Sequence, residues 1–187
     1  KIKKISKSKI IKVKNTFSSL NNLAKITRVN SFAKIIGITG SAGKTTLKNL
    51  ISFSLKNYGK VYQSPLSYNN KFGVPLSIAN LKNNTDYGVF EIGMDKKGEI
   101  DHLSKIIKPD LGIITNISYA HSKNFRSVRK IAEAKAEIMN NIKKNGTVVL
   151  NHDDYFFNYH KSYALKKNLK VVSFGMKNKS SMTKLIK

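Results

Sequence analysis

A glycine-bearing turn in the first third of the chain carries residue types that hold phosphate. Its eight residues are Thr39, Gly40, Ser41, Ala42, Gly43, Lys44, Thr45 and Thr46. Glycines let the backbone turn tightly, so that successive N–H groups point at phosphate oxygens, and the helix expected next presents its positive end to the same anion. Lys44 would neutralise charge on the β- and γ-phosphates, and the Thr45 hydroxyl would ligate Mg²⁺. The run therefore predicts a nucleotide-binding loop.

One position of this loop departs from the common P-loop pattern. The common form has a glycine five residues before Gly43, where this chain has Ile38, and the extra glycine stands at Gly40 instead. The alternative interpretation is a chance glycine-rich turn. Because Gly43, Lys44 and Thr45 follow one another between an expected strand and an expected helix, we favour nucleotide binding.

Two further side chains could hold the metal ion that accompanies a nucleotide. Glu91 ends an apolar run typical of a strand, and a carboxylate there suits Mg²⁺, which prefers oxygen ligands; the alternative is a surface acid at a strand end. His121 follows another apolar run and a short turn, although a lone histidine is more often structural than a ligand. Lys135, by residue type, is one more exposed lysine among many.

Three asparagines also follow apolar runs, namely Asn69, Asn70 and Asn116. Amide groups can position phosphate and substrate groups without adding charge between two anions. Asparagine is equally favoured in turns, so both roles stay open for each of them. Asp153 and Asp154 are interpreted as caps of a following helix.

The elements that must position these residues alternate along the chain. Apolar runs predict strands at residues 34–39, 60–63, 87–91, 111–115, 147–151 and 170–174, and helical spacing predicts helices at 16–25, 45–57 and 127–142. We expect an α/β fold with a mostly parallel sheet and helices on both faces, whose ligands gather at the carboxyl ends of the strands. At the N-terminus we expect an edge strand around Ile10, Ile11 and Val13, and a helix cap from Thr16 or Ser18. At the C-terminus we expect a tail or a surface strand over residues 177–187.

The charge of the chain is strongly positive, with 35 Lys and Arg residues against 10 Asp and Glu and a formal net charge of +25. Such a balance can indicate nucleic acid, an anionic membrane surface or anionic substrates. Arginine, the usual tool of base and phosphate recognition, is scarce, so we do not expect nucleic acid as the main partner. The absence of cysteine excludes disulfides, and no run approaches the roughly 18–20 apolar residues of a membrane span. A cytoplasmic location is expected.

The shifted glycine pattern, T-G-S-x-G-K-T-T, resembles that of the Mur ligase family, which includes the folylpolyglutamate synthases. Further blocks follow in the family's order, at residues 68–76 (YNNKFGVPL), 91–94 (EIGM), 98–100 (GEI), 109–110 (PD), 115–117 (TNI), 120–121 (AH), 134–138 (AKAEI) and 150–154 (LNHDD). Their order and spacing carry the resemblance. The 68–76 block, and the spacing from 91–94 to 98–100, look most like the branch that adds D-alanyl-D-alanine.

The resemblance implies an ATP-dependent amide ligase of peptidoglycan precursor synthesis. ATP would phosphorylate the terminal carboxylate of a UDP-N-acetylmuramoyl tripeptide, and the amine of D-alanyl-D-alanine would attack the acyl phosphate. The implied catalytic residues are Lys44, Glu91, His121 and Lys135. The implied ligands of two Mg²⁺ ions are Thr45, Glu91, His121 and Lys135, the last as a carbamate. ATP would contact residues 39–46 and Asn116, and the substrates would contact Asn69 and Asn70.

The resemblance also implies a domain organisation. Residues 1–33 would be the tail of an N-terminal uridine-nucleotide domain with a connector helix, and residues 34–187 a central ATP-binding domain cut at its C-terminus. A C-terminal closing domain would be absent. We therefore expect this chain alone to bind Mg-ATP weakly and to make no amide, and the full-length enzyme to be a monomer.

Three other interpretations stay open at this point. Within the family, the chain could belong to a ligase that adds a different amino acid or extends folate. From a different class, it could be a P-loop module that binds nucleic acid, with a steep salt dependence, or a domain that senses nucleotide. The joint presence of Lys44, Glu91, His121 and Lys135 argues against a decayed site.

Overall fold

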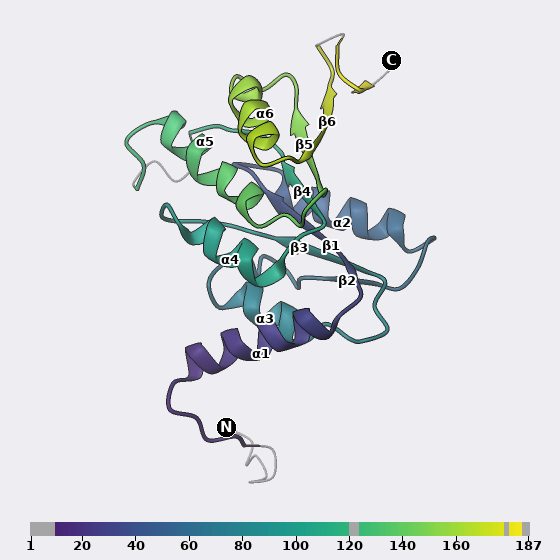
Figure 1. The fold of residues 1–187 in the computed structure, drawn as a ribbon, viewed down its shortest axis with the longest axis vertical. Coiled ribbons are helices and arrows are strands. Elements are labelled where there is room, and N and C mark those ends of the chain that lie inside the picture. The colour runs from purple at the N-terminus through teal and green to yellow at the C-terminus, as the bar shows by residue number, and fades with distance from the viewer. Residues whose placement is uncertain (1–9, 120–123, 178–179, 185–187) are drawn as a thin grey trace.

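The computed structural model describes residues 10–119, 124–177 and 180–184, which form an α/β fold built on one parallel sheet (Figure 1). The strands are β1 (Lys34–Thr39), β2 (Val61–Gln63), β3 (Tyr87–Glu91), β4 (Leu111–Ile114), β5 (Thr147–Asn151), β6 (Lys170–Gly175) and β7 (Thr183–Lys184). The helices are α1 (Thr16–Asn30), α2 (Lys44–Leu55), α3 (Gly73–Ala79), α4 (Glu99–Ile107), α5 (Val128–Ala136) and α6 (Phe157–Lys166), with the 3₁₀ helix η2 (Glu137–Asn140).

The strand order is β2-β3-β1-β4-β5-β6-β7, and every neighbouring pair is parallel. The chain builds β2 and β3 on one side of β1 and then crosses to place β4 on the other. In open sheets of this kind, ligands bind beyond the carboxyl ends of the strands where the order reverses. The register places Ile38 level with Glu91, and Thr39 level with Ile114. The ends of β1, β3 and β4 therefore converge at that point.

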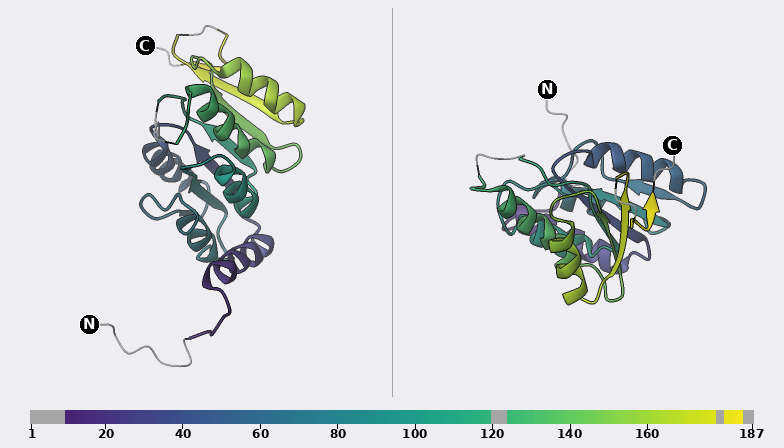
Figure 2. Two further views of the ribbon diagram at one scale, coloured as in Figure 1. Left: turned by 90° about the vertical axis from the view of Figure 1, so that its left-hand side faces the viewer. Right: turned by 90° about the horizontal axis from the view of Figure 1, so that it is seen from above.

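Helices cover both faces of the sheet, as the alternation of elements predicts, but unequally. On one face, α2 packs its Leu47, Ile51 and Leu55 against a small cluster formed by Ile38 and its neighbours in β3 and β4. The larger core lies on the other face, where α4, α5 and α6 pack. The right-hand view of Figure 2 has α2 on the opposite side of the strands from α5 and α6. No helix within the described residues is long and apolar enough to cross a bilayer.

The N-terminal helix is docked on this larger core by a buried charge. Arg28 is 4% exposed, and its guanidinium donates to the carbonyls of Ile107 and Lys108 at the end of α4, while Asp110 lies 3.6 Å away. The last carbonyls of a helix lack intrahelical donors. Arg28 therefore caps α4 from another helix, which explains why α1 continues past residue 25, where the sequence predicts its end.

Several sequence expectations are wrong in detail. Residues 10–15 form no strand, and Asn15, rather than Thr16 or Ser18, caps α1 by accepting from Ser18 N at 2.8 Å. The helix expected over 127–142 is α5 followed by η2, whose residues turn their side chains to the start of α4. The short helices α3 and α4 were not predicted. Helix α3 spans only seven residues, whereas α4 carries Ile100, Leu103 and Ile107 at helical spacing, so its signal was available. The six expected strands are confirmed within one residue at each end.

Candidate functional site

The glycines of the loop between β1 and α2 are required by its shape. Gly43 has φ 79° and precedes the first residue of α2, and Gly40 has φ 147°. A Cβ added at Gly40 would lie 1.8 Å from Oγ1 of Thr115, because the loop passes directly over the end of β4. Ile38, at the position of the common first glycine, is instead a fully buried member of the α2 face. The shifted glycine is therefore a consequence of how β1 and β4 pack.

The loop is held in place by the segment that follows β4. Asn116 accepts the N–H of Ser41 on its carbonyl at 2.9 Å and the N–H of Ala42 on its side-chain oxygen at 3.0 Å. Thr115 donates its hydroxyl to the carbonyl of Ala42 at 2.7 Å. The first N–H groups of α2 have no intrahelical acceptors, so the ordered loop offers them to an anion. Asn116 thus supports the loop from behind.

Two of the four metal ligands expected from the sequence, Thr45 and Glu91, meet directly. Thr45, in the first turn of α2, donates its hydroxyl to Oε2 of Glu91 at 2.6 Å. The side-chain amide of Asn69 donates to the other oxygen, Oε1, at 2.7 Å. Glu91 is 2% exposed, so two donors hold an otherwise buried carboxylate. A hydroxyl and a carboxylate in contact are oxygen ligands of the kind that Mg²⁺ takes beside nucleotide phosphates.

Lys44 and Lys135 form a second, cationic side of the site. The ammonium of Lys44 donates to the carbonyl of Gly40 at 2.9 Å. Burial lowers the pKa of Lys44, and the charge of Glu91 opposes that shift. Lys135 on α5 is 1% exposed, and burial, with the nearby charge of Lys44, lowers its pKa to about 7. Within the described part of the chain, no hydrogen bond or salt bridge involves the Lys135 amine.

Lys135 is therefore not the exposed lysine that residue type alone indicates. His121 lies outside the described residues. The remaining expected residues, from Thr39 to Thr46, surround the start of α2, with Thr39 fully buried at the end of β1. The structure thus brings the P-loop, Glu91, Asn69 and Lys44 together at the carboxyl edge of the sheet.

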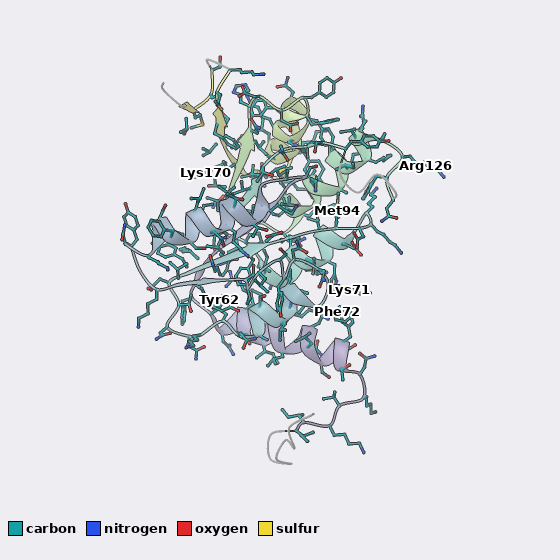
Figure 3. The ribbon with its side chains drawn as sticks, turned by 180° about the vertical axis from the view of Figure 1, so that it is seen from behind. Tyr62, Lys71, Phe72, Met94, Arg126 and Lys170 are labelled. Carbon is teal, nitrogen blue, oxygen red and sulfur yellow. The ribbon has the colours of Figure 1, made fainter. Side chains whose placement is uncertain are left out.

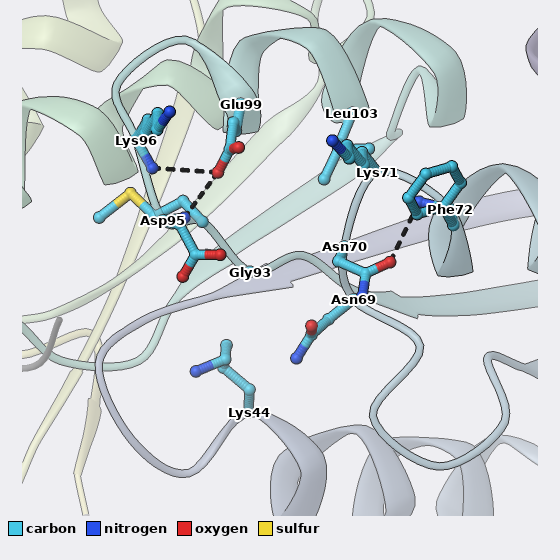
Figure 4. A pocket seen from close by; sticks show the side chains of 11 residues that line it. Lys44, Asn69, Asn70, Lys71, Phe72, Gly93, Asp95, Lys96, Glu99 and Leu103 are labelled. Atoms are coloured by element: carbon cyan, nitrogen blue, oxygen red, sulfur yellow. Dashed lines mark hydrogen bonds between the residues drawn. The ribbon is translucent and has the colours of Figure 1, made fainter. Parts of the chain in front are cut away.

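A cavity of about 370 Å³ opens beside Lys44. Figure 4 shows Lys44 and Asn69 reaching toward it from α2 and from the segment before α3, with Glu99 at the start of α4 on its far side. Other residues that line it are Asn70, Lys71, Phe72, Met94 and Lys96. Lys71 and Phe72 lie side by side in Figure 3, and the Lys71 ammonium lies 5.3 Å from the centre of the Phe72 ring.

The two neighbouring asparagines of this segment have different tasks. Asn69 contacts the Glu91 carboxylate, whereas Asn70 accepts the N–H groups of Phe72 and Gly73 on its side-chain oxygen at 3.0 and 2.9 Å. Asn70 therefore starts α3, which is the turn-forming role that the sequence leaves open for it. Its side chain nonetheless lines the cavity.

Sequence reasoning missed the positioning contacts of Glu137 and Lys48, and for Asp154 it predicted the cap of α6 but not the second contact. Glu137, in η2, accepts the N–H groups of Gly98 and Asp101 and so caps α4 beside the cavity. Asp154 accepts the N–H of Ile117 at 2.7 Å and that of Phe156 at 2.8 Å, so it anchors the segment after β4 as well as the approach to α6. Lys48 is a fully buried lysine in α2. Its place at helical spacing among Leu47 and Ile51 was the available signal.

A family model described as the Mur ligase middle domain matches residues 38–187. The chain belongs to the Mur ligase family. One similar relative within it is the UDP-N-acetylmuramoyl-tripeptide--D-alanyl-D-alanine ligase of Rickettsia prowazekii, 41% identical over 94% of this chain and 39% of that protein. The chain spans about two fifths of the length of this relative.

Solved Mur ligase structures share the fold. The MurF of Acinetobacter baumannii matches with a TM-score of 0.83 at 32% identity, over 87% of this chain and 36% of that one. The MurF ligase of Thermotoga maritima, solved in complex with ADP, matches with a TM-score of 0.81 at 31% identity, over 94% of this chain and 40% of that one. The α/β architecture expected from the sequence is confirmed, and the chain has the Mur ligase middle-domain fold.

Proposed function

We propose that this chain is the ATP-binding middle domain of an amide ligase that adds D-alanyl-D-alanine to a UDP-N-acetylmuramoyl tripeptide during peptidoglycan synthesis. The observation that carries the proposal is the contact between Thr45 and Glu91, which joins a nucleotide loop to a metal-type carboxylate beside an open cavity. Relatives with this printed name support the choice of substrates. In this proposal residues 1–33 belong to the end of a uridine-nucleotide domain, and the full-length protein is a cytoplasmic monomer.

The reaction joins two anions before it makes an amide. A carboxylate oxygen of the tripeptide attacks the γ-phosphorus of ATP, the bond to the β-phosphate oxygen breaks, and ADP leaves. The amine of D-alanyl-D-alanine then attacks the acyl carbon, loses a proton, and expels inorganic phosphate. Repulsion between ATP and the carboxylate opposes the first step, so the site must supply positive charge there.

Several residues of this chain would supply or hold positive charge at the phosphates. The loop N–H groups and the Lys44 ammonium hold the phosphates, and Lys44 gives up its contact with the Gly40 carbonyl to do so. Thr45 and Glu91 would hold Mg²⁺, which neutralises phosphate charge when bound. Asn69 fixes the Glu91 carboxylate through Oε1 and leaves Oε2 on the side of Thr45. The acyl end of the tripeptide would enter through the cavity lined by Asn70 and Lys71.

We further propose that Lys135 carries a carbamate and that, with His121, it would hold a second Mg²⁺. The neutral amine attacks CO₂, a nitrogen–carbon bond forms, and one proton passes to solvent. A neutral amine is needed, and the lowered pKa of about 7 supports its presence at neutral pH. The product is anionic, so the neighbouring Lys44 would change from a repulsive to an attractive partner.

The carbamate is tested by mass spectrometry of the intact protein under neutral conditions. We expect an increase of about 44 Da on Lys135, the mass of CO₂ added to an amine of suitable pKa, which disappears on acidification. Lys135→Ala should lose activity and regain part of it with short carboxylates. Full activity of Lys135→Ala without added carboxylate would contradict the proposed carbamate.

The ligase activity is tested with the full-length protein, ATP and UDP-N-acetylmuramoyl tripeptide. Phosphate release that requires D-alanyl-D-alanine, with a matching new peptide, is the expected result. Release that requires another amino acid, or a folate with glutamate, would assign the chain to another ligase of the family. A nucleic-acid role would instead appear as binding that falls steeply with salt and does not depend on Glu91. The 187 residues alone are expected to bind Mg-ATP weakly and to form no amide.

A further inference from the structure

A second lysine of α2 is buried where no nucleotide contact explains it. Lys48 stands one helical turn after Lys44 and is 1% exposed. Its ammonium donates to the main-chain carbonyls of Ser64, at 2.8 Å, and of Leu66. A buried ammonium is costly unless hydrogen-bonded acceptors compensate for lost water. Here the acceptors are carbonyls of the segment that joins β2 to α3, so Lys48 ties α2 to that segment.

The tied segment has a backbone conformation that needs support. Leu66 has φ 42°, in the left-handed region that residues with a Cβ rarely adopt. Its side chain is 79% exposed, so packing of that side chain does not hold the turn. Upstream, Ser64 is joined to β3 by its N–H, which donates to Val89 O at 3.0 Å. The bond from Lys48 to the carbonyl of Leu66 fixes the turn at the point where it leaves the sheet.

The same segment carries Asn69 to the metal-type carboxylate. Asn69 is joined to its own turn by a bond from its N–H to Ser67 O at 2.7 Å, and it accepts the N–H of Gly93 at 2.8 Å. From there its side-chain amide reaches Oε1 of Glu91. A continuous path therefore runs from Lys48 through the carbonyl of Leu66 to Asn69 and on to Glu91.

We infer that Lys48 is a positioning residue, which pins residues 64–69 so that the Asn69 amide holds Glu91 in the orientation that binds Mg²⁺. The inference rests on the proposed role of Glu91 as a metal ligand. An apolar residue of similar length would fill the same volume but would leave buried carbonyls without a donor. Burial lowers the pKa of the Lys48 ammonium, and the nearby negative charge of Glu91 opposes that shift.

The first arm of the test needs no metal. In the full-length protein, amide hydrogen exchange is measured over residues 64–72 for Lys48→Met and for the control Lys56→Met, an exposed lysine at the end of the same helix. We expect exchange at least about tenfold faster in Lys48→Met, which loses two hydrogen bonds from a charged group, and no change in the control. Exchange at the wild-type rate in Lys48→Met would overturn the inference.

The second arm separates positioning from general weakening. The Mg²⁺ concentration that half-saturates ATP binding is expected to rise about tenfold in Lys48→Met, with nucleotide affinity at saturating Mg²⁺ little changed. In an Asn69→Ala background, Lys48→Met should not raise the Mg²⁺ midpoint any further, because the contact through which Lys48 acts on Glu91 is already lost. Additive effects would overturn the inference.

Two further variants test the inference if Lys48→Met does not fold or if Glu91 does not bind metal. If Lys48→Met is too unstable, the comparison is made in a Leu66→Gly background, since glycine adopts the left-handed turn without strain; exchange over residues 64–72 should still be faster with Lys48→Met than without it, and equal exchange would overturn the inference. Glu91→Gln tests the underlying assumption. If it leaves the Mg²⁺ midpoint unchanged, the proposed metal role fails, while the exchange result still decides whether Lys48 pins the segment.

Discussion

The side-chain hydroxyl of Thr45 donates a hydrogen bond of 2.6 Å to Oε2 of Glu91, which joins the start of α2 to the end of β3. Parallel pairing makes the contact possible, because Ile38 of β1 is level with Glu91 and the nucleotide loop leaves the sheet two residues later. The hydroxyl, the carboxylate and the loop N–H groups therefore face one point. That point is where a magnesium-bound nucleotide would be held.

Replacing the carboxylate by its amide tests this relationship. Glu91→Gln keeps the size of the side chain and an acceptor for Thr45 but removes the negative charge that a hard cation needs. We expect Mg²⁺-dependent ATP consumption by the full-length protein to fall by about a hundredfold, a usual loss for one electrostatic group in a reaction site. Steady-state phosphate release at several Mg²⁺ concentrations measures it.

A surface acid provides the matched control for this substitution. Glu133 pairs with Lys130 on the exposed side of α5 at 2.7 Å. Glu133→Gln is expected to change phosphate release by less than about twofold, since exposed ion pairs contribute little. Equal losses in the two variants would mean that Glu91 has no special role.

The loop glycine at position 40 is expected to tolerate no side chain. Gly40→Ala would place a Cβ 1.8 Å from Oγ1 of Thr115, in addition to the strain of its φ of 147°. We expect a loss of about 3 kcal/mol or more in the free energy of unfolding, measured by urea denaturation, together with loss of ATP binding. Gly98→Ala is the control, because Gly98 has φ 90° but no atom within 4 Å of the added Cβ. Gly98→Ala should lower the free energy of unfolding by less than Gly40→Ala does, and it should retain ATP binding.

The buried guanidinium that joins α1 to α4 is expected to be a stability residue. Arg28→Met removes the donors to the carbonyls of Ile107 and Lys108, which then lie without a partner beneath α1. We expect the free energy of unfolding to fall by about 2–3 kcal/mol. The exposed Lys25→Met on the same helix should leave it within about 0.5 kcal/mol. If Arg28→Met unfolds with the wild-type midpoint, α1 is not held by this contact.

Stability should depend on pH through a buried histidine. His160 is 2% exposed, its Nε2 lies 3.1 Å from the carbonyl of Ala132, and burial lowers its pKa below the ordinary 6.5. Below pH 6.5 the unfolded chain binds a proton that the folded chain resists. The stabilisation is therefore complete above that pH and is lost as the pH falls toward the lowered folded-state value.

Denaturation at a series of pH values checks this dependence. His160→Phe removes the titrating group, so the difference in stability between wild type and variant should shrink or reverse as the pH falls from 7 to 5. The exposed His102→Gln serves as the control and should run parallel to the wild type over that range. A His160→Phe curve that also parallels the wild type would contradict the prediction.

The strands and the nucleotide loop could be predicted from the sequence, because their signals are local. Short apolar runs such as 34–39 and 87–91 are recognisable wherever they occur, and Gly43 followed by Lys44 fits a strand-to-helix turn without knowledge of the rest. The block order along the chain likewise indicated the Mur ligase family, which the family model confirms. The carboxyl-edge location of Thr45 and Glu91 followed from parallel topology alone.

The tertiary structure decided which polar residues are buried and what each one touches. Lys48 and Lys135 are lysines in a chain that holds 35 Lys and Arg residues, and their residue type does not distinguish them from exposed ones. Packing of elements far apart in the sequence buries both, as in the 16-residue separation between Lys48 and Ser64. In the same way Asn69 and Asn70 are identical neighbours, yet the backbone turn directs one to Glu91 and the other to the start of α3. The burial and orientation of a side chain depend on contacts that form when the chain folds. The sequence therefore indicates which residues are candidates, and only the tertiary structure shows which groups they contact.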